Sequence, residues 1–333
     1  MKIIIPMAGM GKRMRPHTLT VPKPLIKIAG KPIVYRLVES ISQVCDDAIE
    51  EIAFIVGDFG KDVENELLDI AKKVGSRGKI YYQEEALGTA HAILCAADSL
   101  EGEVVVAFAD TLFKASFNLD KSKDSIIWVH QVENPQNFGV VKINAENIIT
   151  GFYEKPQDFV SDLAIIGIYY FKDGQNLKNE LQWLIDNNVC KGGEYQITDA
   201  LENMKNKKLL FSTGKVDEWL DCGNKDATVY TNQRILELNK KEKLIDDSFC
   251  NTNAVIISPC YIGKNVTVKS SVIGPHVSIC DNTIIENSVI TNSIIQSNSK
   301  LSNVNIDNSM IGSYVEYKLK YNEVSIGDYT ILG

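Results

Sequence analysis

The stretch Lys2-Ile-Ile-Ile-Pro-Met-Ala-Gly-Met-Gly-Lys-Arg-Met-Arg15 opens the chain and decides how its first half folds. Its three consecutive isoleucines form a β-branched run that is too short for a helix and is ended by Pro6, which predicts a buried strand. Gly9 and Gly11 then allow the backbone to turn tightly and to bring its N–H groups close to a ligand. The stretch therefore predicts a strand that leads directly into a ligand-binding loop.

This loop and the residues after it are basic. Lys12, Arg13, Arg15 and Lys23 lie within a few residues of one another, and the first acidic residue is Glu39. The whole chain is nevertheless acidic, with 43 Asp and Glu against 35 Lys and Arg. A positive loop on an acidic protein favours a small polyanion such as a nucleoside triphosphate as the ligand, and it argues against a nucleic-acid surface.

Two common phosphate-binding loops do not match. The dinucleotide-binding pattern G-x-G-x-x-G requires glycine where Met14 stands. The P-loop requires an early glycine, where this chain has Pro6, and Ser or Thr where it has Arg13. A basic surface turn after an edge strand remains as the non-functional alternative.

Beyond the loop, strand-like and helix-like segments alternate. Apolar runs predict strands at 52–56, 81–83, 104–108, 126–130, 140–143 and 163–171, and apolar stripes predict helices at 32–44, 61–74, 89–98, 177–185 and 197–204. This alternation predicts an α/β fold whose sheet is covered on both faces. Ligands of such sheets bind at the carboxyl ends of the strands, where the opening loop, the segment after Gln83 and Asp110 all fall.

A charge-rich stretch at 225–244 is predicted to be a helix that connects two domains. After it, between about 255 and 311, charges become rare and Ile, Val, Asn and Ser dominate. Aliphatic residues recur six apart, and near-copies of Ser271-Val-Ile-Gly274 return several times. This period predicts a parallel β-helix. The alternative, a disordered Asn/Ser linker, does not account for the dense periodic aliphatics.

Three side chains beyond the loop could carry chemistry. The amide of Gln83 offers a donor and an acceptor for the edge of a base, and Gly88 with Thr89 opens the following helix. Asp110 directly follows a buried strand, and Asp221 supplies a second carboxylate far along the chain. Two carboxylates could hold Mg²⁺, which also keeps waters and bridges to phosphate oxygens.

In combination these motifs resemble those of the sugar-phosphate nucleotidyltransferases. The opening loop and Pro22-Lys-Pro-Leu25 are similar to the G-x-G-T-R-L…P-K-P-L signature of that family. Further segments follow in the family's order, namely Gln83 with Leu87-Gly-Thr-Ala90, Ala109-Asp110, Phe138-Gly-Val-Val141, Glu154-Lys-Pro156, Ile166-Gly-Ile-Tyr169, Gly193-Glu-Tyr-Gln-Ile-Thr-Asp199 and Trp219-Leu-Asp-Cys-Gly223. Lys12 stands in place of the family's Thr and Ala109 in place of a frequent Gly.

The resemblance implies a fold and a domain division. We expect a Rossmann-like nucleotidyltransferase domain with a mixed, mostly parallel sheet at 1–224, a helical connector at 225–247, and a left-handed hexapeptide-repeat β-helix at 248–333. Hexapeptide acyltransferases use a histidine base, but the short repeat and single His276 favour a structural role for that histidine here.

The resemblance also implies roles for individual residues. Arg13, Lys23 and Asp110 would be catalytic, and Asp110 with Asp221 would hold Mg²⁺. The nucleotide would be bound by Ala8, Gly9, Gly11, Gln83, Gly88 and Thr89, and the sugar phosphate by Gly139, Glu154, Lys155 and Gly167. The segment 193–199 receives no role.

The implied reaction joins a sugar 1-phosphate to a nucleoside triphosphate, with release of pyrophosphate. The Gln83 amide favours dTTP or UTP, with glucose 1-phosphate as the first sugar to test. Two alternatives stay open, a mannose-1-phosphate guanylyltransferase and a non-catalytic sensor of sugar nucleotides. No apolar run approaches the ~20 residues of a membrane span, and the seven cysteines are scattered. We therefore expect a cytoplasmic protein without a membrane partner, and the charge pattern described above argues against a nucleic-acid partner. Because the flat aliphatic coils of such a repeat commonly pack against other subunits, we also expect a homo-oligomer.

Overall fold

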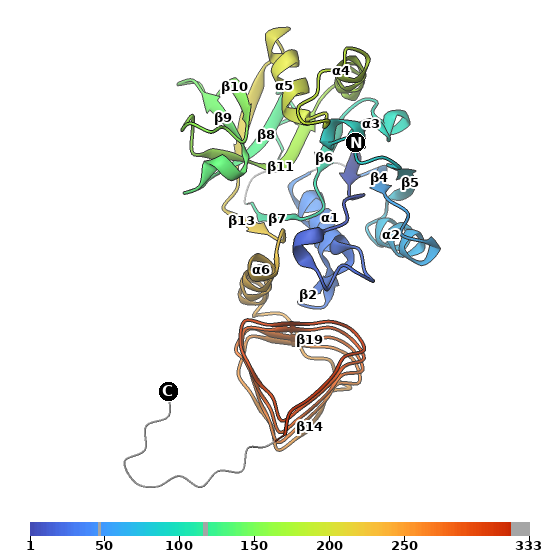
Figure 1. Ribbon diagram of the computed structural model, residues 1–333, viewed down its shortest axis with the longest axis vertical. Coiled ribbons are helices and arrows are strands. Elements are labelled where there is room, and N and C mark those ends of the chain that lie inside the picture. Colours follow the sequence, from blue (N-terminus) through green and yellow to red (C-terminus); the bar gives the residue numbers. More distant parts are fainter. Residues whose placement is uncertain (46–47, 116–118, 321–333) are drawn as a thin grey trace. The chain divides into compact units, whose positions relative to one another are not determined.

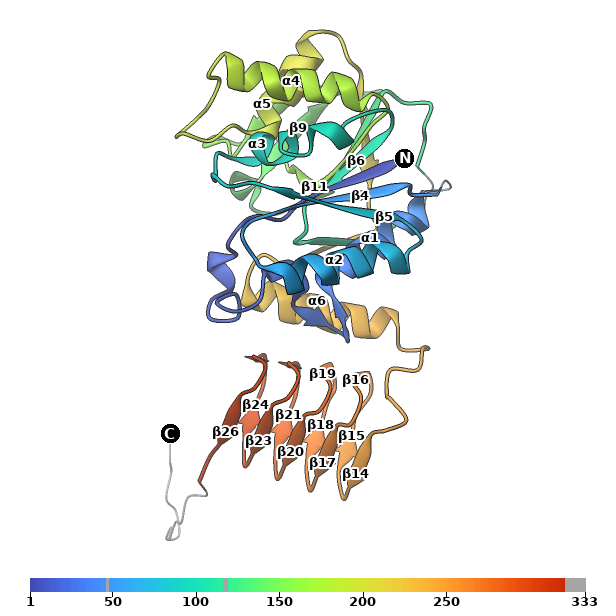
Figure 2. The ribbon, with the colours of Figure 1, turned by 90° about the vertical axis from the view of Figure 1, so that its right-hand side faces the viewer.

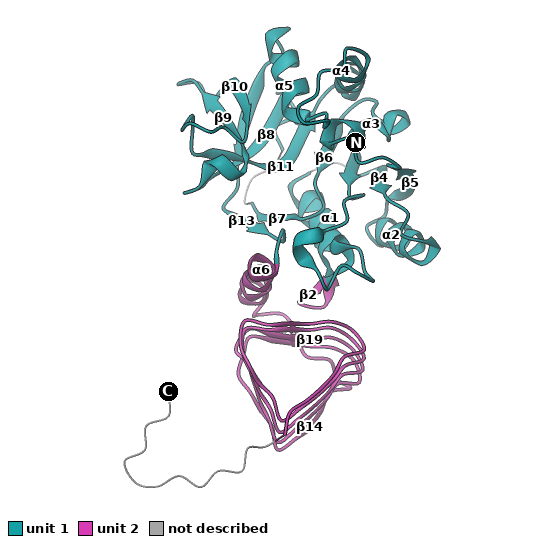
Figure 3. Ribbon diagram, in the orientation of Figure 1, with its two compact units in different colours: residues 1–26, 32–224 teal, residues 27–31, 225–333 magenta. Residues whose placement is uncertain are grey.

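The chain divides into two compact units. The computed structural model describes residues 1–45, 48–115 and 119–320. Unit 1 consists of residues 1–26 and 32–224, and unit 2 consists of residues 27–31 together with the chain from residue 225 onward (Figure 3). Among the described residues, no helix combines the length and the apolar character that crossing a membrane requires.

Unit 1 is built on one mixed sheet, as predicted. Its strands are β1 (Lys2–Pro6), β4 (Glu51–Val56), β5 (Arg77–Tyr82), β6 (Val104–Ala107), β8 (Ser125–Gln131), β9 (Gly139–Ile143), β10 (Ile149–Glu154), β11 (Leu163–Phe171) and β12 (Phe211–Lys215). They lie in the order β10-β9-β11-β6-β1-β4-β5, and β8 pairs with both β11 and β12. The pairs among β6, β1, β4 and β5 are parallel, whereas β11 runs antiparallel to β6, β8 and β9.

Helices cover both faces of this sheet (Figures 1 and 2). They are α1 (Ile33–Val44), α2 (Lys61–Lys73), α3 (Thr89–Leu94), α4 (Gly174–Asp186) and α5 (Ile197–Asn206). Figure 2 shows α1 and α2 on one face and α3, α4 and α5 on the other. Because both faces are covered, the central strands are mostly apolar, and all six residues of β4 are buried, including Glu51 at its start.

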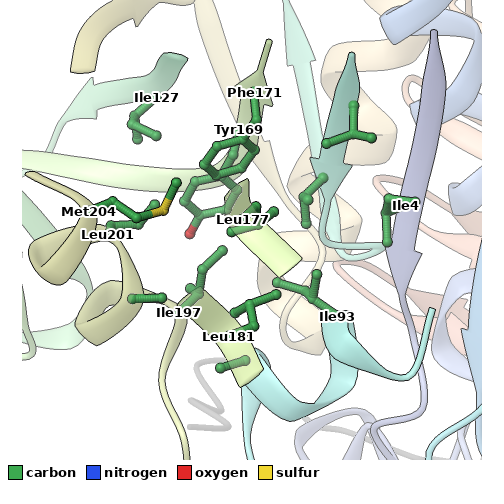
Figure 4. Packing of buried hydrophobic residues seen from close by; sticks show 14 of the residues in the cluster. Ile4, Ile93, Ile127, Tyr169, Phe171, Leu177, Leu181, Ile197, Leu201 and Met204 are labelled. Atoms are coloured by element: carbon green, nitrogen blue, oxygen red, sulfur yellow. The ribbon is translucent and has the colours of Figure 1, made fainter. Parts of the chain in front are cut away.

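The core on the α3–α5 face is continuous. Figure 4 shows Tyr169 and Phe171 of β11 among side chains from the two long helices of that face. Leu177, Leu181 and Leu201 there are at most 1% exposed. This packing fixes the strand ends that carry the loops described below.

Several predicted bounds differ from those of the structure. The predicted helix 89–98 ends at Leu94 and is followed by a 3₁₀ turn at Ala97–Ser99. The edge strands β10 and β12 and the small antiparallel pair of β7 (Thr111–Lys114) with β13 (Glu218–Asp221) were not predicted. These strands are short or contain glycine and polar residues, so their sequences carry little period-2 signal.

Unit 2 contains the predicted β-helix. Its strands form three parallel sheets. The first contains β14 (Cys250–Thr252), β17 (Thr267–Lys269), β20 (Ile284–Glu286), β23 (Lys300–Ser302) and β26 (Glu316–Lys318). The second contains β15 (Val255–Ile256), β18 (Val272–Ile273), β21 (Val289–Ile290) and β24 (Asn305–Ile306), and the third contains β16 (Cys260–Ile262), β19 (Val277–Ile279), β22 (Ile294–Ile295) and β25 (Met310–Ile311). Figure 1 shows the β-helix from its end, so that the coils form a triangle, and Figure 2 shows the stacked coils from the side. Three sheets of stacked parallel strands are consistent with a left-handed β-helix.

The corners of the coils explain the abundance of asparagine. Asn265, Asn282 and Asn298 occupy equivalent corners, and all three have positive φ, which asparagine tolerates better than most residues. Their side chains form a hydrogen-bonded ladder between positions that are first 17 and then 16 residues apart. Some sides of the triangle are therefore shorter than the six-residue period that the sequence suggests.

The helix α6 (Lys225–Leu238) also belongs to unit 2. It ends at Leu238 rather than at the predicted 244, because the chain there pairs with the first coil: Ile262 donates its N–H to the Leu244 carbonyl. His276 occupies a corner with positive φ, and its Nε2 lies 2.7 Å from Glu237 Oε1 of α6. This contact agrees with the structural role expected for His276.

Candidate functional site

One cavity of about 310 Å³ lies at the carboxyl ends of β1, β5 and β6. Its walls are Pro6, Met7, Ala8, Gly9, Gly11, Lys23, Pro24, Gln83, Ala86, Gly88, Thr89, Ala92, Phe108, Ala109, Asp110 and Glu194. The three segments that the sequence placed after separate strands therefore meet, because neighbouring parallel strands end at the same edge of a sheet. All six residues predicted to bind the nucleotide lie in these walls.

The glycine loop owes its shape to a left-handed residue. Gly11 has φ 56° and begins a 3₁₀ turn at Lys12–Met14. A Cβ at this position would lie 3.1 Å from side-chain atoms of both Lys23 and Thr18. The Thr18 hydroxyl in addition donates a hydrogen bond of 2.9 Å to the Gly11 carbonyl. The backbone conformation thus favours glycine here, and a Cβ would in addition require Lys23 and Thr18 to shift.

Lys23 is held ready in a stiff loop. It lies between Pro22 and Pro24 in a short 3₁₀ turn, which limits the freedom of the backbone. Its Nζ lies 2.5 Å from Asp110 Oδ2, and its side chain is only 14% exposed. The structure therefore places the Lys23 ammonium and the Asp110 carboxylate in contact on the wall of the cavity.

The second carboxylate reaches this place through the β7–β13 pair. Asp221 is the partner of Thr111 in that ladder, and the N–H of Cys222 donates to the Asp110 carbonyl over 2.9 Å. Burial raises the pKa of Asp221, and the negative charge of Asp110 raises it further, while Lys23 and Arg13 act in the opposite direction. The two predicted metal ligands are therefore close enough to repel each other.

Such a pair fits a hard divalent cation. A cation between the carboxylates would relieve their repulsion, and Mg²⁺ accepts one or two carboxylates together with phosphate oxygens and water. Within the described part of the chain, no group of three His, Cys, Asp or Glu side chains is placed to hold a metal. Two carboxylates suit a metal that a phosphate substrate helps to bind.

The segment from Gln83 to Thr89 is held in place by residues 195–197 of the same unit. The amide nitrogen of Gln83 lies 3.2 Å from the Gly88 carbonyl and 3.1 Å from Nδ1 of His91. Gly88 has φ 103°, and a Cβ there would lie 2.5 Å from the backbone oxygen of Tyr195. Thr89 donates its hydroxyl to the Gln196 side chain and accepts the N–H of Ile197, so this hydroxyl is engaged within the protein.

The four predicted sugar-phosphate residues lie outside these walls. Gly139 and Glu154 face each other across β9 and β10, and the backbone of Lys155 has positive φ. The Lys155 ammonium is 3.8 Å from Glu154 and its side chain is 65% exposed. Gly167 (φ 85°) lies in a bulge of β11, where its carbonyl accepts the N–H of Phe108. Arg13 is likewise absent from the walls, but a Cβ on Gly223 would lie 3.3 Å from its guanidinium.

Sequence reasoning missed several residues of this neighbourhood. Glu194 lines the cavity, and Thr198 donates its hydroxyl to Glu154 over 3.2 Å. Both belong to the segment 193–199, for which the family resemblance implies no role. Trp219 packs edge-to-face on Phe138 at 5.1 Å, and its Nε1 is buried without a hydrogen-bond partner among the described residues. Trp219 shares a face of β13 with Asp221, which was the available signal.

Comparisons with known proteins agree with this geometry. A family model described as "Nucleotidyl transferase" matches residues 2–237. The "Bifunctional protein GlmU" of Methanococcus maripaludis is 32% identical over 264 residues, which cover 77% of this chain and 60% of that protein. The "Glucose-1-phosphate thymidylyltransferase" of Streptomyces antibioticus is 28% identical over 309 residues, which cover 85% of this chain and 83% of that protein.

A solved structure supports the fold. The crystal structure of a UDP-glucose pyrophosphorylase complexed with UDP-glucose matches with a TM-score of 0.59 and 25% identity. The match covers 71% of this chain and 98% of that one. The matched residues span about 60% of the length of the GlmU protein.

Proposed function

We propose, from the premise that the chain belongs to the nucleotidyl transferase family, that it joins a sugar 1-phosphate to a nucleoside triphosphate. The observation that carries the proposal is the contact of Lys23 with Asp110 on the wall of the cavity, between the glycine loop and the Gln83 segment. A triphosphate lying across this wall would have its phosphates beside the basic loop and its base beside Gln83.

The proposed chemistry needs no general base. An oxygen of the sugar phosphate attacks the α-phosphorus, the bond from that phosphorus to the α–β bridging oxygen breaks, and pyrophosphate leaves with the electron pair. The attacking oxygen is already an anion, so catalysis consists of positioning and of charge neutralisation. In this proposal Lys23 would meet the α-phosphate, and Lys155 would meet the incoming sugar phosphate.

Asp110 and Asp221 would hold Mg²⁺, which when bound supplies positive charge to offset the charge on the phosphates. Without it, the two carboxylates would repel a polyanion. Arg13 and Lys23 partly compensate, since both lower the pKa of Asp221. The backbone N–H groups from Ala8 to Gly11 complete the proposed triphosphate cradle.

The Gln83 amide supports a preference for thymine or uracil. While its nitrogen contacts the Gly88 carbonyl and His91, Gln83 offers its carbonyl oxygen to a ligand. Thymine and uracil present a ring N–H that this oxygen can accept, and so does guanine, whereas adenine lacks one. A mispaired buried polar group costs ~1–3 kcal/mol, or about ten- to a hundredfold in preference. We therefore propose dTTP or UTP, with glucose 1-phosphate as the sugar.

The test is a pyrophosphate-release panel of dTTP, UTP, GTP and ATP, each with glucose 1-phosphate and with mannose 1-phosphate. We expect turnover with dTTP or UTP and glucose 1-phosphate. A lead for GTP with mannose 1-phosphate would instead establish the guanylyltransferase alternative. Nucleotide binding without any pyrophosphate release would favour the non-catalytic sensor and overturn the proposal.

A further inference from the structure

A hairpin in unit 2 interrupts the sequence of unit 1 just after Lys23. The chain leaves unit 1 at residue 27, returns to it at residue 32 and enters unit 2 for good at residue 225. The excursion is a two-stranded hairpin of β2 (Lys27–Ile28) and β3 (Lys31–Pro32). Ala29 and Gly30 at its tip both have positive φ, as two-residue turns of this kind require. Figure 3 shows β2 in the colour of unit 2.

A buried asparagine of α6 holds the tip of this hairpin. Asn232 is fully buried, and its Oδ1 accepts the N–H of Ala29 over 2.9 Å. The same oxygen accepts the Ser278 hydroxyl of β19 over 2.6 Å, and Asn232 Nδ2 lies 3.4 Å from the His276 carbonyl. One side chain thus joins the hairpin, the helix and a coil of the β-helix.

Two further contacts fix the hairpin on the coils. The amide nitrogen of Gln296 donates to the Lys27 carbonyl over 2.9 Å. A Cβ on Gly30 would lie 2.2 Å from the ring of Tyr261, so this ring lies directly against the Gly30 backbone. Ser278 and Ile294 point outward from the same sheet and are nevertheless fully buried. This face of the β-helix is covered, whereas Ile284 on another face is 37% exposed.

The base of the hairpin continues into the loop of Lys23. Ile33 donates its N–H to the Ile26 carbonyl, which closes the base. Ile26 in turn donates to the Lys23 carbonyl, and Leu25 to that of Pro22. A displacement of the hairpin would therefore be passed through two backbone hydrogen bonds to the residue that contacts Asp110.

We propose that Asn232, Gln296 and Tyr261 act as positioning residues for Lys23 by holding this hairpin. Unit 2 would then contribute to the reaction although every motif of the chemistry lies in unit 1. The inference rests on the proposed function only for its kinetic part. Misplacing a reacting group by about 1 Å can cost up to ~10²-fold in rate, so a small movement of the loop would suffice.

The test compares two glycine variants. Gly30→Ala places a methyl group against Tyr261, whereas Gly60→Ala introduces the same residue at the same φ of 82° with nothing within 4 Å. Gln296→Leu is a milder variant that removes the hydrogen bond to the Lys27 carbonyl and the weak one that Gln296 accepts from the Cys280 thiol over 3.8 Å. It guards against misfolding of the first variant. Each full-length variant is compared with the parent by kcat, by KM and by amide hydrogen exchange of residues 22–33.

We expect Gly30→Ala to lower kcat about tenfold or more, with the nucleotide KM within about twofold of the parent. Amide exchange should accelerate at Leu25 and Ile26 as well as in the hairpin, because their N–H groups donate to Pro22 and Lys23 and so close the Lys23 turn. Gln296→Leu should show the same pattern more weakly, and Gly60→Ala should show neither effect.

Exchange that accelerates only at residues 27–31, or a kcat equal to that of Gly60→Ala, would overturn the inference and leave the hairpin as a tether. A parent without turnover in the nucleotide panel would instead refute the proposed function. In that case the exchange at Leu25 and Ile26 would still decide whether the hairpin controls the Lys23 loop.

Discussion

At the scale of single residues, Lys23 is held in a defined position, since its ammonium contacts Asp110 from a turn between two prolines. Lys23→Ala is expected to lower kcat by ~10²–10³, the usual cost of losing one preorganised donor to a transition state. The measurement is pyrophosphate release, with circular dichroism to confirm folding. Lys172→Ala, at an exposed lysine just after β11, is the control. A Lys23→Ala enzyme within threefold of the parent would contradict the assigned role.

Ionised Asp221 is expected to lower the free energy of unfolding when no divalent cation is bound. Burial and the charge of Asp110 raise its pKa, so folding favours the protonated form. The protonated Asp221 side chain contributes fully to stability below the pKa of an Asp in the unfolded chain, about 3.9. This contribution is lost as the pH rises through the raised pKa that Asp221 has in the folded protein. At neutral pH the ionised carboxylate therefore destabilises the metal-free fold.

Asp221→Asn is accordingly expected to raise Tm at pH 7.5 in chelator by a few degrees, since ~1 kcal/mol moves Tm by roughly 2–4 °C in a domain of this size. The gain should vanish near pH 4, and turnover should be lost. Added Mg²⁺ should raise the Tm of the parent but not of the variant. Differential scanning calorimetry of both proteins, with exposed Asp62→Asn as control, checks this. A variant less stable than the parent at pH 7.5 would refute the charge repulsion.

At this scale the sequence indicated the residues that follow strands, and Asp221 was found only through the family motif around it; the contacts of the Gln83–Thr89 segment with distant residues were missed. Asp110 and the glycine loop could be placed because each directly follows a buried strand. Thr89 meets Gln196 across 107 positions, and the contact of Gly88 with Tyr195 is similarly remote. No local pattern encodes such contacts, so the way in which the segment from Gln83 to Thr89 is held emerges only from the tertiary fold.

Among the elements, the coils of the β-helix depend on stacked columns of aliphatic residues. Val268, Ile285 and Leu301 are register partners in successive coils, and each is at most 1% exposed. Ile285→Ala should cost ~2–5 kcal/mol, because it leaves a cavity between coils. Ile284→Ala, one position earlier and 37% exposed, should cost less than ~1 kcal/mol.

Urea unfolding of the full chain measures the change in the free energy of unfolding for each of the two variants. Amide exchange in peptides that cover β17 to β23 monitors the unfolding of the coils. Equal costs for the two neighbouring isoleucines would show that the register of the coil differs from the one described. A matched pair on one strand removes differences in propensity and in chain length from the comparison.

The same scale shows why some elements were predictable from sequence. The three isoleucines of β1 and the buried run of β4 are unambiguous, and the aliphatic period of the coils identifies the β-helix. The helix predicted to reach 244 ends at Leu238, because the following backbone pairs with a coil. Strands such as β12, with one fully buried side chain among polar residues, take their conformation from their partner β8.

For the whole molecule, the uneven distribution of charge has a measurable effect. The chain carries a net charge of −8, while its first 38 residues contain no acid. A triphosphate is therefore attracted locally and repelled by the rest, and both interactions are screened by salt. At saturating Mg²⁺, KM for the nucleotide should rise about threefold or more between ~0.02 and ~0.2 M NaCl, because the nearby cationic loop dominates.

The kinetic series is run with parent and Arg15→Ala, and sucrose at equal osmolality controls for effects other than charge. The variant should show a higher KM at low salt and a shallower slope. A KM that is independent of salt would mean that the basic loop does not contact the triphosphate.

The stacked coils of unit 2 bear on how such a chain can change in evolution. Within the stack each coil contacts only the coils next to it, and corner asparagines recur after 16 residues in the later coils. Duplication or loss of a segment of that length would return every side chain to an equivalent place, with the hydrogen-bond pattern intact. Gene rearrangements could thus lengthen or shorten this unit in whole coils, whereas the coils that hold residues 27–31 would be kept under selection.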